Sequence, residues 1–135
     1  MKLTSEMYFL TLVTAFTAVM WVPYILSRIA TQGALGAMGN PDPSATTDPA
    51  WAQRAKRAHA NAVENLAVFA PLVLIAALLG ISTPGTVLAA KVYLIARLVH
   101  YVVYAAGIPG VRTLAFLVGF GATAVFATTI LGHVV

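Results

Sequence analysis

Four long apolar stretches constrain the fold of this chain more than any other feature of its sequence. A helix needs about 20 predominantly apolar residues to cross a bilayer, and each stretch approaches or exceeds that length. The composition agrees, because 60% of the 135 residues are hydrophobic and only 9% are charged, with a mean hydropathy of +0.87. The sequence therefore predicts an all-α integral membrane protein, a four-helix bundle that forms one domain over residues 1–135.

Turn and capping residues set the expected bounds of the helices. The pair Asp48-Pro49 is typical of an N-cap followed by proline at the first helical position, and Gly80 is expected to end that helix. Residues 31–47 are rich in Gly, Pro, Ser and Thr, so a loop is expected there. The predicted helices cover residues 7–29, 49–79, 84–106 and 111–132. A cleaved signal peptide is the alternative interpretation of the first, but its apolar stretch exceeds the usual length.

The positions of the cations predict the orientation of the chain in the membrane. One side has Lys2, offset by Glu6. The first and third loops, on the other side, carry or adjoin a larger set of cations, namely Arg28, Arg54, Lys56, Arg57 and Arg112. Loops rich in Lys and Arg stay in the cytoplasm, so both loops are expected there. The start of the second helix, the end of the third and the start of the fourth would then meet on that side.

The residue content disfavours several classes of function. The chain has no cysteine, which excludes disulfides, thiolate metal sites and a cysteine nucleophile. Its eight Lys and Arg residues form no basic run with interleaved aromatic residues, so nucleic acid is not an expected partner. No metal site is expected, because His59 and Glu64 do not share a helix face and His133 is predicted on the opposite side of the membrane.

Polar side chains recur at helical spacing on two of the predicted helices, among apolar neighbours. On the second helix they are Arg57, Asn61 and Glu64, and on the third they are Arg97, His100 and Tyr104. Arg97 lies about four turns into an apolar helix, so it must find a carboxylate or a ligand anion. One interpretation is structural, with an ion pair between Arg57 and Glu64 and with Arg28 and Lys56 at lipid phosphate. The other is an anionic ligand, because the cations outnumber Glu64.

These residues resemble the motifs of the MAPEG family, the membrane-associated proteins in eicosanoid and glutathione metabolism. The family motif on the second helix reads R-x-x-R-A-x-x-N-x-x-E with a Phe five residues on, and the matching residues here are Arg54, Arg57, Ala58, Asn61, Glu64 and Phe69. A second motif near the end of the third helix is matched by Ala96, Arg97, His100 and Tyr104. A third, at the start of the fourth helix, is matched by Pro109 and Arg112.

The resemblance implies a homotrimer that binds glutathione between neighbouring subunits near the cytoplasmic face. From the second helix, the residues expected to hold glutathione are Arg57, Asn61 and Glu64. Arg28 is expected to reach a glutathione carboxylate from the first helix. The residues expected to line the wall formed by the third helix are Arg97, His100 and Tyr104. Arg112 is expected beside the sulfur, where the hydroxyl of Thr113 would add a hydrogen bond.

The activity implied by the resemblance is that of a glutathione transferase or peroxidase. A thiol reacts as its thiolate, and a guanidinium at a helix N-terminus favours the anion, so Arg112 and Thr113 are the expected catalytic residues. The thiolate would attack a hydrophobic electrophile or a lipid hydroperoxide that enters from the bilayer. A bacterial-type member would lie in the inner membrane.

Two alternatives come from other classes of protein. A relative without catalysis would bind an anionic lipid or another ligand in the same cleft. A small proton-coupled exporter also fits four helices, but such a transporter needs an acidic group near the membrane centre and the first helix has none there.

Overall fold

The computed structural model describes residues 2–41 and 48–134 as a bundle of helices. The helices are α1 (Ser5–Val19), α2 (Trp21–Met38), α3 (Ala50–Leu78), α4 (Pro84–Ala106) and α5 (Pro109–Leu131). Helices α1 and α2 are separated only at Met20 and together form one segment that is long and apolar enough to cross a membrane. With α3, α4 and α5, the described residues contain four such segments. The predicted fold class, an all-α integral membrane protein with four spans, is therefore confirmed.

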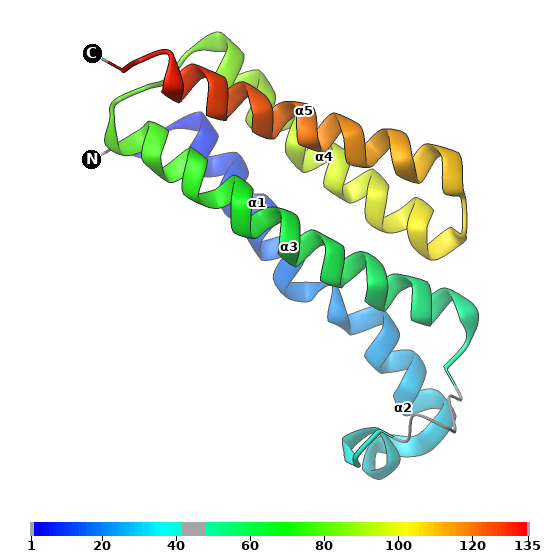
Figure 1. The fold of residues 1–135 in the computed structure, drawn as a ribbon. Coiled ribbons are helices and arrows are strands. Elements are labelled where there is room, and N and C mark those ends of the chain that lie inside the picture. The colour runs from blue at the N-terminus through cyan, green and yellow to red at the C-terminus, as the bar shows by residue number, and fades with distance from the viewer. Residues whose placement is uncertain (1, 42–47, 135) are drawn as a thin grey trace.

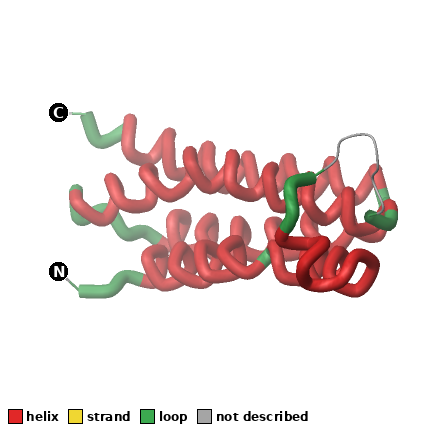
Figure 2. The backbone as a smooth tube through the Cα atoms, turned by 90° about the horizontal axis from the view of Figure 1, so that it is seen from below, coloured by secondary structure: helices red, strands yellow, loops and turns green. Residues whose placement is uncertain are grey.

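The bundle has two distinct ends (Figure 1). Helix α5 packs along α4, whereas α3 runs beside the consecutive helices α1 and α2. Both chain termini lie at one end, together with the connection from α3 to α4, as the view in Figure 2 also shows. The turn from α4 to α5 and the start of α3 lie at the other end, which we call the loop end.

The first span is longer than the sequence predicted. The helical segment begins at Ser5 and continues to Met38, so residues 31–38 of the expected loop are helical. Residues 42–47 of that predicted loop lie outside the described residues. Gly33 interrupts this segment with a φ of 74° and redirects the chain, as glycine can at no steric cost. The residues that follow Gly33 are mostly Ala, Leu and Met, which favour helix, so the chain resumes its helical course.

The start of α3 also differs from the prediction. Pro49, not Asp48, is the N-cap residue, and no side chain caps this helix end. The carboxylate of Asp48 is instead paired with Arg28 of α2. A second contact joins the same two helices, because the hydroxyl of Tyr24 and Nδ1 of His59 lie 2.8 Å apart in a hydrogen bond.

An aromatic cluster fills the core toward the end of the bundle that holds the termini. Phe69 of α3 stacks on Tyr93 of α4 with ring centroids 3.6 Å apart, and Phe126 of α5 meets Phe69 edge-on at 5.5 Å. All three side chains are buried. Stacked and edge-on aromatic pairs add to the free energy of burial, so this cluster joins three helices at one level.

A buried carboxylate ties the start of α1 to the start of α4. Glu6 is only 3% exposed, and it accepts hydrogen bonds from the hydroxyls of Thr86 at 2.6 Å and Ser82 at 3.1 Å. Thr86 belongs to the capping box that begins α4, in which it pairs with Thr83. The sequence indicated only that Glu6 offsets the charge of Lys2. In the structure, Glu6 joins α1 to the start of α4 through hydrogen bonds.

Arg54 of α3 supports the turn between α4 and α5. Its Nε donates to the carbonyl of Ala105 at 3.0 Å, near the C-terminus of α4, where the helix dipole favours a cation. Gly107 ends α4 with a φ of 82°, a left-handed conformation that favours glycine. A Cβ at Gly107 would lie 3.2 Å from Cζ of Arg54. The turn is therefore shaped by a side chain from a third helix.

Candidate functional site

Small residues occupy the buried face of α3 toward the loop end of the bundle. Alanines recur on the buried face of this helix, at Ala52, Ala55, Ala58 and Ala62. Short side chains allow helices to approach closely in a membrane protein, and they leave room for larger partners on the facing helix. On α4, larger polar side chains share one face by their spacing, at Tyr93, Arg97, His100 and Tyr104.

Arg97 is the centre of this cluster and is only 2% exposed. Its Nη2 donates to Oδ1 of Asn61 on α3 at 2.8 Å and lies 3.4 Å from Nδ1 of His100, one turn further along α4. Asn61 also accepts a hydrogen bond through Oδ1 from Asn65 at 3.3 Å. The structure thus joins the predicted residues of α3 and α4 through a direct contact between Asn61 and Arg97.

The cluster continues from Arg97 to the start of α5. His100, which is 3% exposed, meets the ring of Tyr104 edge-on with centroids 5.5 Å apart. Cζ of Arg112 lies 4.5 Å from the centroid of the Tyr104 ring, so this guanidinium makes a cation–π contact. We call the five residues Asn61, Arg97, His100, Tyr104 and Arg112 the polar row. It leads from the buried centre of the bundle to the half-buried Arg112.

The polar row holds two guanidinium groups and no carboxylate. Among the described residues the ion pair that the structure contains is between Arg28 and Asp48, so neither Arg97 nor Arg112 is paired with an acid. The sequence required a carboxylate or a ligand anion for Arg97, and the structure supplies the amide of Asn61 instead. Nε of Arg97 is buried without a hydrogen-bond partner in the described part of the chain. A buried cation in this state favours a nearby anion.

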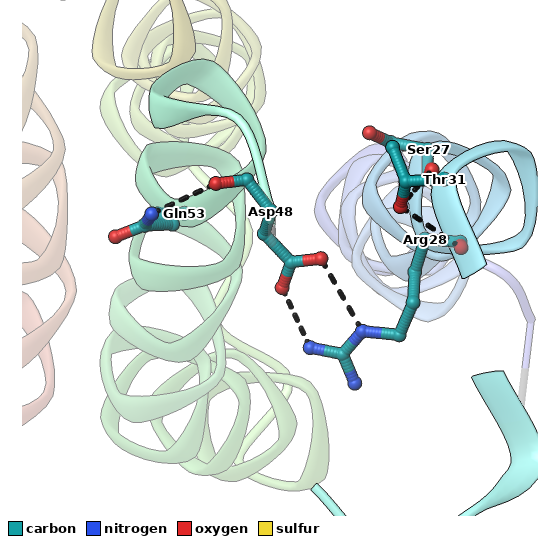
Figure 3. Close-up of polar contacts among 5 residues, drawn as sticks. All are labelled: Ser27, Arg28, Thr31, Asp48 and Gln53. Carbon is teal, nitrogen blue, oxygen red and sulfur yellow. Dashed lines mark hydrogen bonds and ion pairs between the residues drawn. The ribbon is translucent and has the colours of Figure 1, made fainter. Parts of the chain in front are cut away.

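Arg28, one of the predicted glutathione-binding residues, lies apart from the polar row. Figure 3 shows its guanidinium facing the carboxylate of Asp48, with Nη2 to Oδ2 at 2.7 Å and Nε to Oδ1 at 3.4 Å. The side chains of Arg28 and Asp48 are 21% and 15% exposed. Hydrogen bonding from Arg28 holds the pKa of Asp48 below its ordinary value, although partial burial opposes this effect.

This pair predicts a pH-dependent contribution to stability. A lowered pKa in the folded state means that the pair stabilises the protein above about pH 4 and that this stabilisation is lost as the pH falls through the lower pKa of Asp48. Because the pair is partly exposed, we expect about 1 kcal/mol or less. Asp48→Asn should lower the apparent melting temperature, followed by tryptophan fluorescence, at neutral pH and have no effect in acid.

A double-mutant cycle provides the control for this prediction. Arg28→Gln should have the same effect as Asp48→Asn, and the double variant should be no less stable than either single variant. Additive losses in the double variant would show that the two side chains act independently.

Three further predicted residues are placed at the surface of the single chain. Arg57 and Glu64 are exposed on α3, and the structure gives neither of them a hydrogen bond or an ion pair among the described residues. The structural interpretation of these two as an ion pair is therefore not supported within one chain. Thr113 is exposed on α5, and its hydroxyl donates to the carbonyl of Pro109 at 3.2 Å.

Two residues near the polar row were missed from the sequence. The hydroxyl of Tyr93 is buried next to Arg97 and has no hydrogen-bond partner among the described residues. Its spacing of four residues from Arg97 was the available signal. Asn65 donates to Oδ1 and to the backbone carbonyl of Asn61, and its spacing of four residues from Asn61 gave the same kind of signal. In the described part of the chain, no three His, Asp or Glu side chains lie close enough together to hold a metal ion.

Comparison with known proteins agrees with the motifs of the polar row. The model of the MAPEG family matches residues 7–132, nearly the whole chain. A search of curated proteins finds no match.

Proposed function

The chain belongs to the MAPEG family, and on that premise we propose that it is a membrane-embedded glutathione transferase or peroxidase. The family contains enzymes of both kinds. The proposed co-substrates are hydrophobic electrophiles or lipid hydroperoxides that reach the protein through the bilayer. The polar row is the proposed place of the chemistry.

The observation that carries this proposal is the composition of the polar row. Two guanidinium groups, on Arg97 and Arg112, are connected through His100 and Tyr104 in one continuous set of contacts and lack an acidic partner among the described residues. Glutathione fits such a place by charge, because it has two carboxylates and a thiol that is reactive as an anion. The buried Nε of Arg97 without a partner is consistent with a site built around negative charge.

Each residue of the polar row has a proposed role that follows from its position. Glutathione supplies the nucleophilic sulfur when it is bound. Arg112 lies in the first turn of α5, where its charge and the amides of the helix N-terminus both stabilise an anion. Tyr104 holds the guanidinium of Arg112 by its ring. Asn61 and His100 keep Arg97 in place, since both contact its Nη2.

Thr113 contributes less to this proposal than the sequence suggested. Its hydroxyl proton is engaged by the carbonyl of Pro109, so a hydrogen bond to sulfur would require the hydroxyl to rotate away from its own helix. Arg112 is therefore the main proposed catalytic residue.

The proposed assembly is a homotrimer with glutathione between neighbouring subunits. Arg57 and Glu64 support an assembly of this kind, because both are exposed on a membrane-spanning helix without a partner among the described residues. Ionisable groups at such positions are costly in hydrocarbon and favour contact with another subunit, a ligand or water. Arg57 and Glu64 remain proposed glutathione ligands on these grounds. Arg28, which is paired with Asp48 in the single chain, remains one only because the resemblance implies it.

The proposed orientation places the loop end of the bundle in the cytoplasm, in a bacterial inner membrane. The loop end has or adjoins Arg28, Arg54, Lys56, Arg57 and Arg112. The opposite end has Lys2 and also Lys91, an exposed residue about two turns into α4 that the charge count from the sequence did not include. The excess of cations still favours a cytoplasmic loop end.

The proposal is tested by equilibrium binding of glutathione to the purified protein in detergent, with the ultraviolet absorbance of the thiolate as a second signal. We expect binding at millimolar glutathione or below, a thiolate signal at neutral pH, and a particle mass that corresponds to three subunits. S-methylglutathione is the matched control, because it should bind without the thiolate signal. Binding without a thiolate would favour the non-catalytic alternative, and no binding at millimolar glutathione would refute the glutathione site.

A further inference from the structure

The turn between α4 and α5 contains only two residues, Gly107 and Ile108. The amide of Gly107 donates to the carbonyl of Tyr104 at 3.1 Å, and the amide of Ile108 donates to the carbonyl of Val103 at 2.9 Å. Hydrogen bonds of this kind close the last turn of a helix, and Pro109 then begins α5 with a fixed φ. The turn therefore leaves little freedom between the end of α4 and the start of α5.

One carbonyl at the end of α4 cannot bond to its usual amide. The carbonyl of Ala105 would accept from the amide four residues further on, but that residue is Pro109, which has no N–H. Arg54 of α3 supplies a donor instead, with Nε 3.0 Å from the carbonyl oxygen. This guanidinium thus completes the hydrogen bonding of a helix end that proline leaves open.

The same guanidinium lies against Gly107. From the place that a Cβ of Gly107 would take, Cζ, Nε and Nη2 of Arg54 are 3.2, 3.3 and 3.4 Å away. The similar distances to three of its atoms mean that the flat group, and not only its tip, meets the turn. Arg54 therefore holds the turn in two ways, by a hydrogen bond at Ala105 and by close contact at Gly107.

The two partners of the cation–π contact in the polar row lie on opposite sides of this turn. Tyr104 belongs to the last turn of α4, and Arg112, whose Cζ is 4.5 Å from the centroid of its ring, belongs to the first turn of α5. The amide of Arg112 donates to the carbonyl of Ile108 at 3.4 Å, so the start of α5 is connected directly to the turn. A change in the turn therefore moves the guanidinium of Arg112 relative to the ring of Tyr104.

We propose that Arg54 is a positioning residue for Arg112, on which it acts through the turn at Gly107. The proposal rests on the proposed function and deepens it, because a side chain of α3 then controls the place of the group that stabilises the thiolate. Loss of Arg54 displaces Arg112, which weakens the stabilisation of the thiolate and lowers kcat. The KM for glutathione changes little, since Arg54 does not itself hold the peptide.

Two variants test the turn from its two sides. Arg54→Met keeps a long side chain and removes the donor and the charge, whereas Gly107→Ala disturbs the same turn with every charge retained. For each we expect kcat at neutral pH to fall about tenfold and the thiolate titration to move to higher pH, because a small displacement of a reacting group is costly. Lys56→Ala, which removes an exposed cation of the same helix, is the matched control and should change neither.

A double-mutant cycle separates positioning from general stability. If Arg54 acts through Arg112, adding Arg54→Met to Arg112→Ala should cost less than a further twofold in kcat. Multiplied losses in the double variant would overturn the proposal. A higher KM for glutathione in Arg54→Met, with kcat and the thiolate titration unchanged, would also overturn it, because Arg54 would then be a ligand. Gly107→Ala paired with Arg112→Ala gives the same cycle if Arg54→Met folds poorly.

A second measurement does not depend on turnover. The NMR resonance of Nε–H of Arg112, assigned by its absence from Arg112→Lys, should carry a ring-current shift from Tyr104 in wild type and in Lys56→Ala. In Arg54→Met and Gly107→Ala it should move toward the value of a free arginine. An unchanged resonance in both would refute the positioning role, whatever the thiolate shows. The expected change of this resonance in a protein whose wild type forms no thiolate would instead refute the proposed function alone.

Discussion

Replacing Arg112 with alanine is expected to lower the rate of glutathione conjugation by about 10²–10³-fold, the usual effect of removing one group that stabilises developing or reacting negative charge. The guanidinium lies at the N-terminus of α5 and rests on the ring of Tyr104, so its charge is both fixed in place and supported by the helix dipole. Without it, the pKa of the bound thiol should rise toward about 8.5, the value of a free thiol.

The measurement is the pH dependence of the thiolate absorbance together with kcat/KM. The thiolate titration of Arg112→Ala should move to higher pH, so the deficit in rate should shrink as the pH is raised. Arg112→Lys should keep part of the effect, because an ammonium retains the charge but not the planar contact with Tyr104. Lys56→Ala is the matched control, since it removes an exposed cation of α3 outside the polar row. Equal losses for Arg112→Ala and Lys56→Ala would assign the effect to overall charge.

Replacing Asn61 with alanine is expected to destabilise the protein by about 2–3 kcal/mol, because the buried guanidinium of Arg97 loses its principal hydrogen-bond acceptor. The remaining contact, to His100, is long at 3.4 Å. The apparent melting temperature in detergent measures the loss. Glutathione binding should weaken in the same variant, because Arg97 is no longer held in one position.

Two variants separate the polar contact from packing. Asn65→Ala is the matched control, because Asn65 bonds only within its own helix, so its loss should cost less than 1 kcal/mol, as in other exposed or intrahelical contacts. The double variant Asn61→Leu with Arg97→Met should regain most of the lost stability, since apolar residues of similar volume often replace a buried polar pair at little cost. It should nevertheless bind no glutathione. Equal melting temperatures for Asn61→Ala and Asn65→Ala would contradict the importance of the contact with Arg97.

The sequence predicted correctly those features that depend on residues close together in the chain. Hydropathy depends on composition within one stretch, so the four membrane spans were predictable. Helical spacing also placed Arg97, His100 and Tyr104 on one face of α4, where the structure brings them into mutual contact. The expected loop at 31–47 was wrong over residues 31–38, because the chain leaves the helical conformation at Gly33 (φ 74°, ψ 165°) and is helical again directly after this kink.

The contacts that the sequence did not predict involve partners from elsewhere in the chain. Arg28 stays a predicted ligand of a glutathione carboxylate, but its contact in the single chain, with Asp48 from 20 residues further on, was not predictable. Arg54 belongs to the family motif, but only the packing of α3 against the end of α4 shows that it supports the turn at Gly107. Spacing alone carries no information about such encounters, because they are set by how separate helices approach one another.

The tie between Glu6 and the start of α4 has a consequence for how the chain enters the membrane. Helices of a membrane protein are inserted in the order of synthesis, and Glu6 arrives with the first of them. Its hydrogen-bond donors, Ser82 and Thr86, follow about 80 residues later at the beginning of the third span. Until then the carboxylate must stay at the water interface, because an ionised group without partners is costly in hydrocarbon. The hydrogen bonds that hold Glu6 in the bundle can therefore form only after the third span has been made, which couples the start of the first span to a later step of biogenesis.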